Sequence, residues 1–260
     1  MFYIPIFVSI LVIFAFRWYN AKLWRCLNLN TFRMIWQGLD WSYLTDILLT
    51  IIPALICITF HELCHGLTAY KLGDSTAKRM GRLSLNPMKH IDWMGLAMMV
   101  VFRFGWAKPV PVNMLNFKNP KKGMAVTALA GPVSNLVLTA LMLALYGPLF
   151  VLSAVGRGGV VVEILATMVS TTAYLSLALA VFNLLPVPPL DGSKILCSVL
   201  SDKAYWKLMI YERYGMILML LLVSTGVLRT PLSFVTESCF NFLFPIAQVT
   251  ADWTVSLLWR

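Results

Sequence analysis

Apolar residues along this chain are gathered into long continuous runs. Six of these runs can cross about 30 Å of hydrocarbon as helices, the first of them only just. The runs fall near residues 2–19, 46–70, 125–150, 160–184 (continuing through 190–200), 208–228 and 232–257. The pattern predicts an all-α polytopic membrane protein with about six transmembrane helices.

The segment between the second and third runs, residues 71–124, is long for a loop and too short for an independent domain. Its apolar piece, 93–104, is too short to span a membrane. We therefore expect a re-entrant loop or short β element, which needs protein or a water-filled cavity to satisfy its backbone. Alternating residues near 82–85 and 107–112 predict short strands, whose prolines suit a sheet edge. A merely solvated loop is the alternative.

The composition agrees with a membrane protein. Of the 260 residues, 59% are hydrophobic and 12% are charged, whereas soluble domains carry about 25% charged residues. No repeat or linker divides the chain. We expect one membrane domain over residues 1–260, with its core at about 46–200, an N-terminal extra span at 1–20 and C-terminal extra spans at 208–257.

The net charge of +10 comes from basic residues between the apolar runs, so it indicates membrane orientation rather than binding to nucleic acid. A cytoplasmic N-terminus places 15 of the 21 Lys and Arg residues on the cytoplasmic side. We expect a multi-pass protein of the cell (plasma) membrane in this orientation. Residues 1–16 lack the basic start and the small-residue cleavage site of a signal peptide, which favours a retained first span or signal anchor over a removed signal peptide.

Two histidines and a carboxylate lie in the second apolar run, at His61, Glu62 and His65. Ionisable residues inside hydrocarbon are costly and by default mark a functional site. On a helix, His61 and His65 are one turn apart and face the same way, which suits two ligands of one zinc ion. Glu62 points about 100° away, where it can reach a water molecule at the metal without being a ligand.

A zinc site of this kind needs a third protein ligand. His90 lies in a basic loop and is better explained as structural. Asp191 follows the proline-rich stretch 183–190, which breaks the helix, and Gly192 permits an unusual backbone turn there. An intramembrane carboxylate needs a partner, which zinc would supply. Capping of a helix at 192–200 explains Asp191 equally well.

The five cysteines show no paired spacing and are interpreted as packing residues. Cys64 lies beside the histidines, where an approach to a metal is the alternative to an apolar filler. Gly131 and Pro132 precede Asn135, so tight helix packing is the ordinary explanation of Asn135, and a place facing the active-site cavity is the alternative.

Several motifs follow one another between residues 46 and 200. They are His61-Glu62-Leu63-Cys64-His65, Gly73-Asp74-Ser75-Thr76-Ala77-Lys78, Gly81-Arg82-Leu83-Ser84-Leu85-Asn86-Pro87, Gly105-Trp106-Ala107-Lys108-Pro109-Val110-Pro111-Val112, Ala130-Gly131-Pro132-Val133-Ser134-Asn135 and Asn183-Leu184-Leu185-Pro186-Val187-Pro188-Pro189-Leu190-Asp191-Gly192. Together they resemble the site-2 protease family of intramembrane zinc metalloproteases, in a compact form without an inserted PDZ domain or a terminal regulatory domain.

The resemblance implies that His61, His65 and Asp191 bind one zinc ion (Zn2+) and that Glu62 is the general base. It also implies that Asn183 supports the oxyanion, and that residues 81–112 form a re-entrant strand element near the substrate. The chain departs from the family at Trp93, where relatives often have proline. We hypothesise that an edge strand within 106–112 holds an unwound substrate by strand addition.

The function that follows is intramembrane zinc metalloendopeptidase. Such an enzyme hydrolyses peptide bonds in or near the transmembrane segments of membrane-protein substrates, as in regulated intramembrane proteolysis. The expected partners are the lipid bilayer and single-pass transmembrane proteins, and the sequence leaves open whether another protease trims these first. The alternatives are a membrane transporter of zinc or another divalent cation that uses the same His/Asp cluster, and a non-catalytic relative.

Overall fold

A computed structural model describes residues 41–95, 107–201, 214–215, 218–219, 221–223 and 225–259. The expected first span at 2–19, about half of the run at 208–228 and most of the apolar piece at 93–104 lie outside the described residues. The described part of the chain is mostly helical.

Long helices account for four of the expected runs. They are α3 (Trp41–Lys71), α6 (Pro120–Ala154), α7 (Gly159–Asn183) and the consecutive pair α10 (Arg229–Leu243) and α11 (Pro245–Leu258). The stretches that are long and apolar enough to cross a membrane are Leu49–Lys71, Pro120–Ala154, Gly159–Asn183 and Arg229–Leu258. An integral membrane protein built of helices is thereby confirmed.

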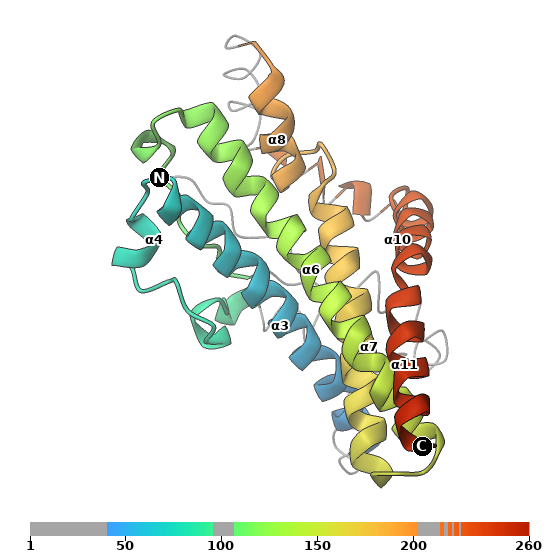
Figure 1. Ribbon diagram of the computed structural model, residues 1–260. Helices are drawn as coiled ribbons and strands as arrows, with labels where there is room; N and C mark the ends of the chain where they lie inside the picture. The colour runs from blue at the N-terminus through green and yellow to red at the C-terminus, as the bar shows by residue number, and fades with distance from the viewer. Residues whose placement is uncertain are drawn as a thin grey trace.

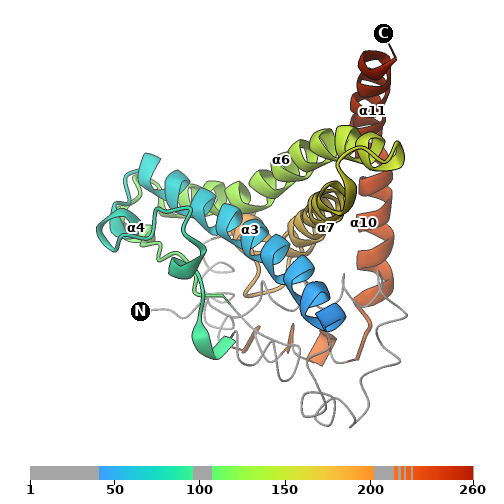
Figure 2. The ribbon, with the colours of Figure 1, turned by 90° about the horizontal axis from the view of Figure 1, so that it is seen from below.

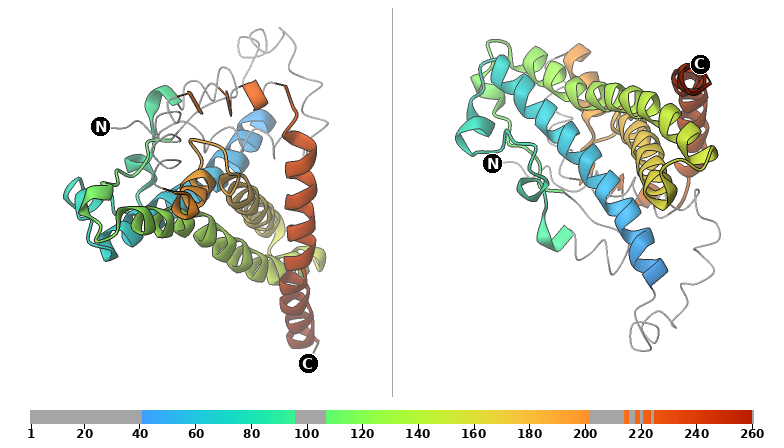
Figure 3. Two further views of the ribbon diagram at one scale, coloured as in Figure 1. Left: turned by 90° about the horizontal axis from the view of Figure 1, so that it is seen from above. Right: turned by 60° about the horizontal axis from the view of Figure 1, so that its bottom comes forward.

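The helix α6 lies at the centre of the arrangement. In Figure 1, α3 runs along one side of α6 and α7 along the other, and both pack against it. The helix α11 packs on the C-terminal half of α6, and α10 lies against α7 (Figures 2 and 3). The short helix α8 (Asp191–Val199) returns to the N-terminal half of α6 (Figure 1). Residues far apart in the sequence therefore meet along α6.

Small residues let these helices approach closely, as is usual between membrane helices. Ala54 and Cys57 of α3 and Ala178 of α7 are buried in one core cluster, together with Leu179 and Phe182. In α6, a Cβ atom added at Gly147 would meet the backbone of α11 closer than van der Waals contact allows. The packing therefore depends on short backbone-to-backbone distances.

The connection between α3 and α6 contains the short helices α4 (Thr76–Arg79), η2 (Pro87–Lys89) and η3 (Met114–Asn116). The strands expected at 82–85 and 107–112 are not confirmed, because the described residues hold only an isolated antiparallel bridge between Ile91 and Ala107.

The hydrogen bonds of residues 107–112 explain why no strand forms there. Pro109 and Pro111 have no N–H to give to a ladder. The Arg82 guanidinium donates to the carbonyls of Lys108 (2.7 Å) and Pro109 (2.9 Å), so a side chain takes the place of a partner strand.

Asp74 connects the end of α3 to the segment that leads into α6 through hydrogen bonds. Its buried carboxylate accepts hydrogen bonds from the backbone N–H of Thr76 (3.0 Å), the backbone N–H of Asn113 (2.7 Å) and the side-chain amide of Asn116 (2.6 Å). Burial alone would raise the pKa of Asp74, but these hydrogen bonds and that of the Thr76 hydroxyl outweigh it and hold the pKa below its ordinary value. The ionised form of Asp74 therefore stabilises the connection.

We predict that Asp74→Asn loosens residues 110–116. Hydrogen bonds to a charged group contribute about 1.5–3 kcal/mol each, so amide exchange at Asn113 should become about tenfold to a hundredfold faster. Because the folded-state pKa is lowered, this stabilisation is present above the unfolded pKa of about 3.9 and is lost as the pH falls through the folded value. Hydrogen-exchange mass spectrometry of native and variant protein across pH measures it.

The matched control is Asp92→Asn, in the same connection, whose carboxylate accepts from the amides of Met94 and Gly95. This variant should leave exchange at Asn113 unchanged. Native exchange at Asn113 in the Asp74 variant would contradict the assignment.

Candidate metal centre

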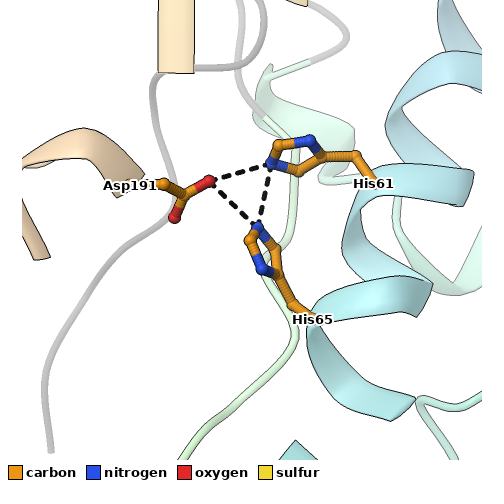
Figure 4. A group of neighbouring side chains, drawn as sticks. All are labelled: His61, His65 and Asp191. Atoms are coloured by element: carbon orange, nitrogen blue, oxygen red, sulfur yellow. Dashed lines mark hydrogen bonds and ion pairs between the residues drawn. The ribbon is translucent and has the colours of Figure 1, made fainter. Parts of the chain in front are cut away.

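His61 and His65 project from successive turns of α3 towards the carboxylate of Asp191, the first residue of α8 (Figure 4). The Nε2 atoms of the two histidines are 2.9 Å apart, and Asp191 Oδ2 lies 3.1 Å from His61 Nε2 and 3.0 Å from His65 Nε2. All three side chains are buried. The structure therefore brings together the three residues expected to be ligands, from parts of the sequence 126 residues or more apart.

This donor set fits one zinc ion. The three ligand atoms lie within 4.8 Å of one another. Two ligands of a tetrahedral zinc ion lie about 3.3 Å apart, close to the separations of the imidazole nitrogens and the carboxylate oxygen. Two imidazoles and one carboxylate are also a ligand set that catalytic zinc sites use, with the fourth position for water or substrate. A single Zn2+ ion therefore agrees with the residues present.

The break between α7 and α8 presents Asp191. The chain leaves α7 after Asn183 and re-enters a helix at Asp191, with Leu190 at the cap position. Asp191 is thus placed at a helix end, as expected, but its carboxylate faces the histidines. A Cβ atom added at Gly192 would collide with the carbonyl oxygens of Leu184 and Leu185.

The prediction of an unusual backbone turn at Gly192 is wrong, because Gly192 is not among the described glycines with a positive φ. Glycine is needed there to allow a close approach of two backbone segments.

Lys194, which sequence reasoning missed, places its Nζ 3.5 Å from Asp191 Oδ1. Its signal in the sequence was the spacing of three residues on one helix.

The helix α6 contacts the far side of both imidazoles. Thr127 O accepts a hydrogen bond from His65 Nδ1 at 2.7 Å, and the Asn135 amide lies 3.4 Å from His61 Nδ1. Between them, a Cβ atom added at Gly131 would overlap both imidazole rings. Sequence reasoning missed Thr127, because the contact uses a backbone carbonyl that any residue could supply.

Glu62 points towards the connection between α3 and α6. Its buried Oε2 accepts a hydrogen bond from the Val110 backbone N–H at 2.8 Å. Gly66, one turn along α3, makes room for this contact, since a Cβ atom there would lie 2.9 Å from the Val110 side chain. Burial holds the pKa of the Arg82 guanidinium below its ordinary value, and the negative charge of Glu62 opposes this shift.

The other candidates have separate places. The Asn183 side-chain N–H donates to Leu179 O of its own helix at 3.0 Å. His90 is buried in the connection, where its Nε2 pairs with Ser84 O at 2.9 Å, in agreement with a structural role. Cys64 is a free thiol. The metal-ligand cluster found among the described residues contains neither His90 nor Cys64.

We predict that Gly131→Ala reduces metal binding at least tenfold, because the new methyl group would displace both imidazoles. The measurement is metal content after dialysis, together with the dissociation constant from chelator competition. The matched control is Gly123→Ala in the same helix, where the three atoms nearest to the added methyl all belong to Phe117. The control should lower thermal stability and keep the metal. Full metal affinity in the Gly131 variant would show that the rings are not held by α6.

Comparisons with known proteins agree with a zinc-binding site in this chain. The model of peptidase family M50 matches residues 143–223. Two relatives carry the description "Putative zinc metalloprotease". YwhC of Bacillus subtilis (strain 168) is 40% identical over 181 residues, which cover 67% of this chain and 80% of the relative. Rip2 of Mycolicibacterium smegmatis (strain ATCC 700084 / mc(2)155) is 28% identical over 193 residues, which cover 72% of this chain and 71% of the relative. No solved structure matches the chain. The chain therefore belongs to peptidase family M50, the site-2 protease family of membrane zinc metalloproteases.

Proposed function

We propose that this protein hydrolyses peptide bonds in or near the transmembrane segments of single-pass membrane proteins, in regulated intramembrane proteolysis. The observation that carries the proposal is the buried cluster of His61, His65 and Asp191, with Glu62 on the next position of the same membrane-spanning helix. Burying four ionisable groups is costly unless they have partners and a function. A cation transporter is not favoured, because the related proteins are described as metalloproteases.

In this proposal His61, His65 and Asp191 hold the zinc ion and Glu62 is the general base. Zinc bound there supplies Lewis-acid chemistry, lowering the pKa of water to about 7. Glu62 takes a proton from the water that attacks the peptide carbonyl carbon, and it later delivers this proton to the leaving amine nitrogen as the C–N bond breaks. The Val110 N–H holds Oε2 of Glu62, so we assign the proton transfer to Oε1.

Asn183 is proposed to stabilise the negative charge that develops on the carbonyl oxygen. A side-chain amide has two N–H donors, and the hydrogen bond to Leu179 O uses one of them. A donor of this kind contributes about 2.7–4 kcal/mol in a well-studied hydrolase.

We further propose that the connection between α3 and α6 enters the membrane and contacts the substrate. Its described part exposes large apolar side chains, namely Leu85, Met88, Trp93 and Met94. Lipid or a substrate helix would cover such residues. The neighbouring segment 107–112 contains Val110, which binds Glu62, so a substrate strand paired with this segment would lie beside the general base.

The proposed topology keeps about six spans, with a catalytic core at about 46–200 and further spans at 1–20 and 208–257 in one membrane domain. The N-terminus and the active site face the cytoplasmic side of the plasma membrane. The support is the distribution of Lys and Arg, 15 of 21 on that side. Water has to reach the site from this side through a polar cavity.

We predict that Glu62→Gln lowers cleavage of a reconstituted single-pass substrate by about 10²–10⁴-fold, the usual contribution of a general base. Zinc content should stay at one ion per chain, because Glu62 is not a ligand. The assay compares native and variant protein in proteoliposomes with fluorescently labelled candidate substrates. Glu163→Gln, which changes an exposed glutamate of α7, is the matched control and should keep full activity. Equal cleavage by native protein and Glu62→Gln would refute proteolysis by this site.

We also predict that replacing residues 107–112 with a helix-forming sequence abolishes cleavage of transmembrane substrates at normal zinc content. The segment would no longer offer an extended edge. Lys118→Ala, which truncates an exposed polar side chain beyond the segment, is the control and should leave cleavage intact. Persistent cleavage of a transmembrane substrate after the replacement would contradict the strand-addition hypothesis.

A further inference from the structure

One face of α6 packs against the two histidines of α3. Thr127, Gly131 and Asn135 are spaced four apart, as are His61 and His65. Thr127 O pairs with His65 Nδ1, Gly131 leaves room for both rings, and Asn135 faces His61 Nδ1. Each imidazole therefore has a polar group of α6 at Nδ1 and the metal-ligand cluster at Nε2.

The partner at Nδ1 determines which nitrogen of a neutral imidazole can bind a metal. A backbone carbonyl only accepts hydrogen bonds, so the contact with Thr127 O places the proton of His65 on Nδ1. Its Nε2 then directs a lone pair into the cluster. For His61 Nε2 to bind in the same way, the proton of His61 has to lie on Nδ1 as well, and that N–H needs an acceptor.

Asn135 is the group placed to supply this acceptor. In the orientation of the structure its Nδ2 lies 3.4 Å from His61 Nδ1, which would set two N–H groups against each other. Its Oδ1 is buried and finds no hydrogen-bond partner among the described residues. Turning the amide by 180° exchanges these atoms, directs Oδ1 at the Nδ1–H of His61 and gives the buried oxygen a partner.

The backbone at Asn135 is also held in place. Its carbonyl accepts hydrogen bonds from Thr139 Oγ1 of α6 at 2.8 Å and from Ser176 Oγ of α7 at 2.9 Å. The side chain is fully buried. Packing alone would be met by an apolar residue of this size, whereas a buried amide needs hydrogen-bond partners.

We propose that Asn135 is a positioning residue whose Oδ1 accepts a hydrogen bond from His61 Nδ1–H and thereby keeps His61 Nε2 available for zinc. The inference rests on the proposed zinc site of His61, His65 and Asp191. It assigns to Asn135 a role towards a ligand, without contact with the substrate or the reacting atoms.

The native protein tests the proton position directly. The chain has three histidines, so nitrogen-15-labelled histidine gives few signals in detergent micelles. In the zinc-loaded protein, His61 should show a hydrogen-bonded proton on Nδ1, as His65 does. An unprotonated Nδ1 with the proton on Nε2 of His61 would overturn the proposal.

Two variants separate an acceptor from a packing residue. Asn135→Asp keeps an oxygen facing Nδ1, whereas Asn135→Leu keeps the size and removes the acceptor. The proposal expects zinc affinity close to native for the Asp variant and about 10–100-fold weaker affinity for the Leu variant, measured by chelator competition. The control is Ser134→Ala, since Ser134 Oγ bonds only within α6, to Gly131 O at 2.6 Å, among the described residues; it should bind zinc as the native protein does.

The opposite order, with native zinc affinity for Leu and weakened affinity for Asp, would show that Asn135 only packs and would overturn the proposal. Different results would reject the proposed function and the role of Asn135. If the native protein binds no zinc, the proposed function fails, whereas native zinc binding with the reversed order rejects the role of Asn135 alone. If the Leu variant does not fold, the proton position in the native protein still decides.

Discussion

The structure depends on burying two imidazoles and a carboxylate inside an apolar bundle. Each of these groups alone would be costly in hydrocarbon, so each needs a close polar or charged partner. His61 and His65 come from one helix, but Asp191 has to arrive from a distant part of the chain and at the same depth. The break between α7 and α8 meets this requirement, because it ends one helix and starts another with the carboxylate at its first residue.

Close backbone approach is what makes this meeting possible. Gly131 lets α6 lie against both imidazole rings, Gly192 lets the start of α8 lie on the carbonyls of Leu184 and Leu185, and Gly66 lets the segment around Val110 lie on α3. Each of these glycines borders a different contact of the same site. A methyl group at any of them would overlap atoms of the neighbouring segment, so a ligand or the general base would have to shift, which a metal site tolerates poorly.

The sequence predicted the parts of the site that side chains encode over short spacings. His61, Glu62 and His65 follow from the spacing of four residues between the two histidines on a helix, and the four described spans follow from their apolar runs. The sequence pattern around Asp191 fits a metal ligand and a helix cap equally well, and only the resemblance of the whole motifs to the family favours the ligand. The contacts of Thr127 O and of the Val110 N–H could not be foreseen, because backbone groups carry no signal in the sequence. The strands were expected from alternation that in fact serves contacts with Arg82 and Glu62.

The segment 107–113 illustrates why alternation misled. Its polar backbone groups are engaged one after another: Lys108 N–H by His90 O, the carbonyls of Lys108 and Pro109 by Arg82, Val110 N–H by Glu62 and Asn113 N–H by Asp74. Pro109 and Pro111 have no N–H. A substrate strand that pairs here therefore has to use the remaining groups or compete with Glu62 for the N–H of Val110. In the second case, substrate binding would release Oε2 of Glu62 from the Val110 N–H, so the position of the general base would depend on substrate binding through one hydrogen bond.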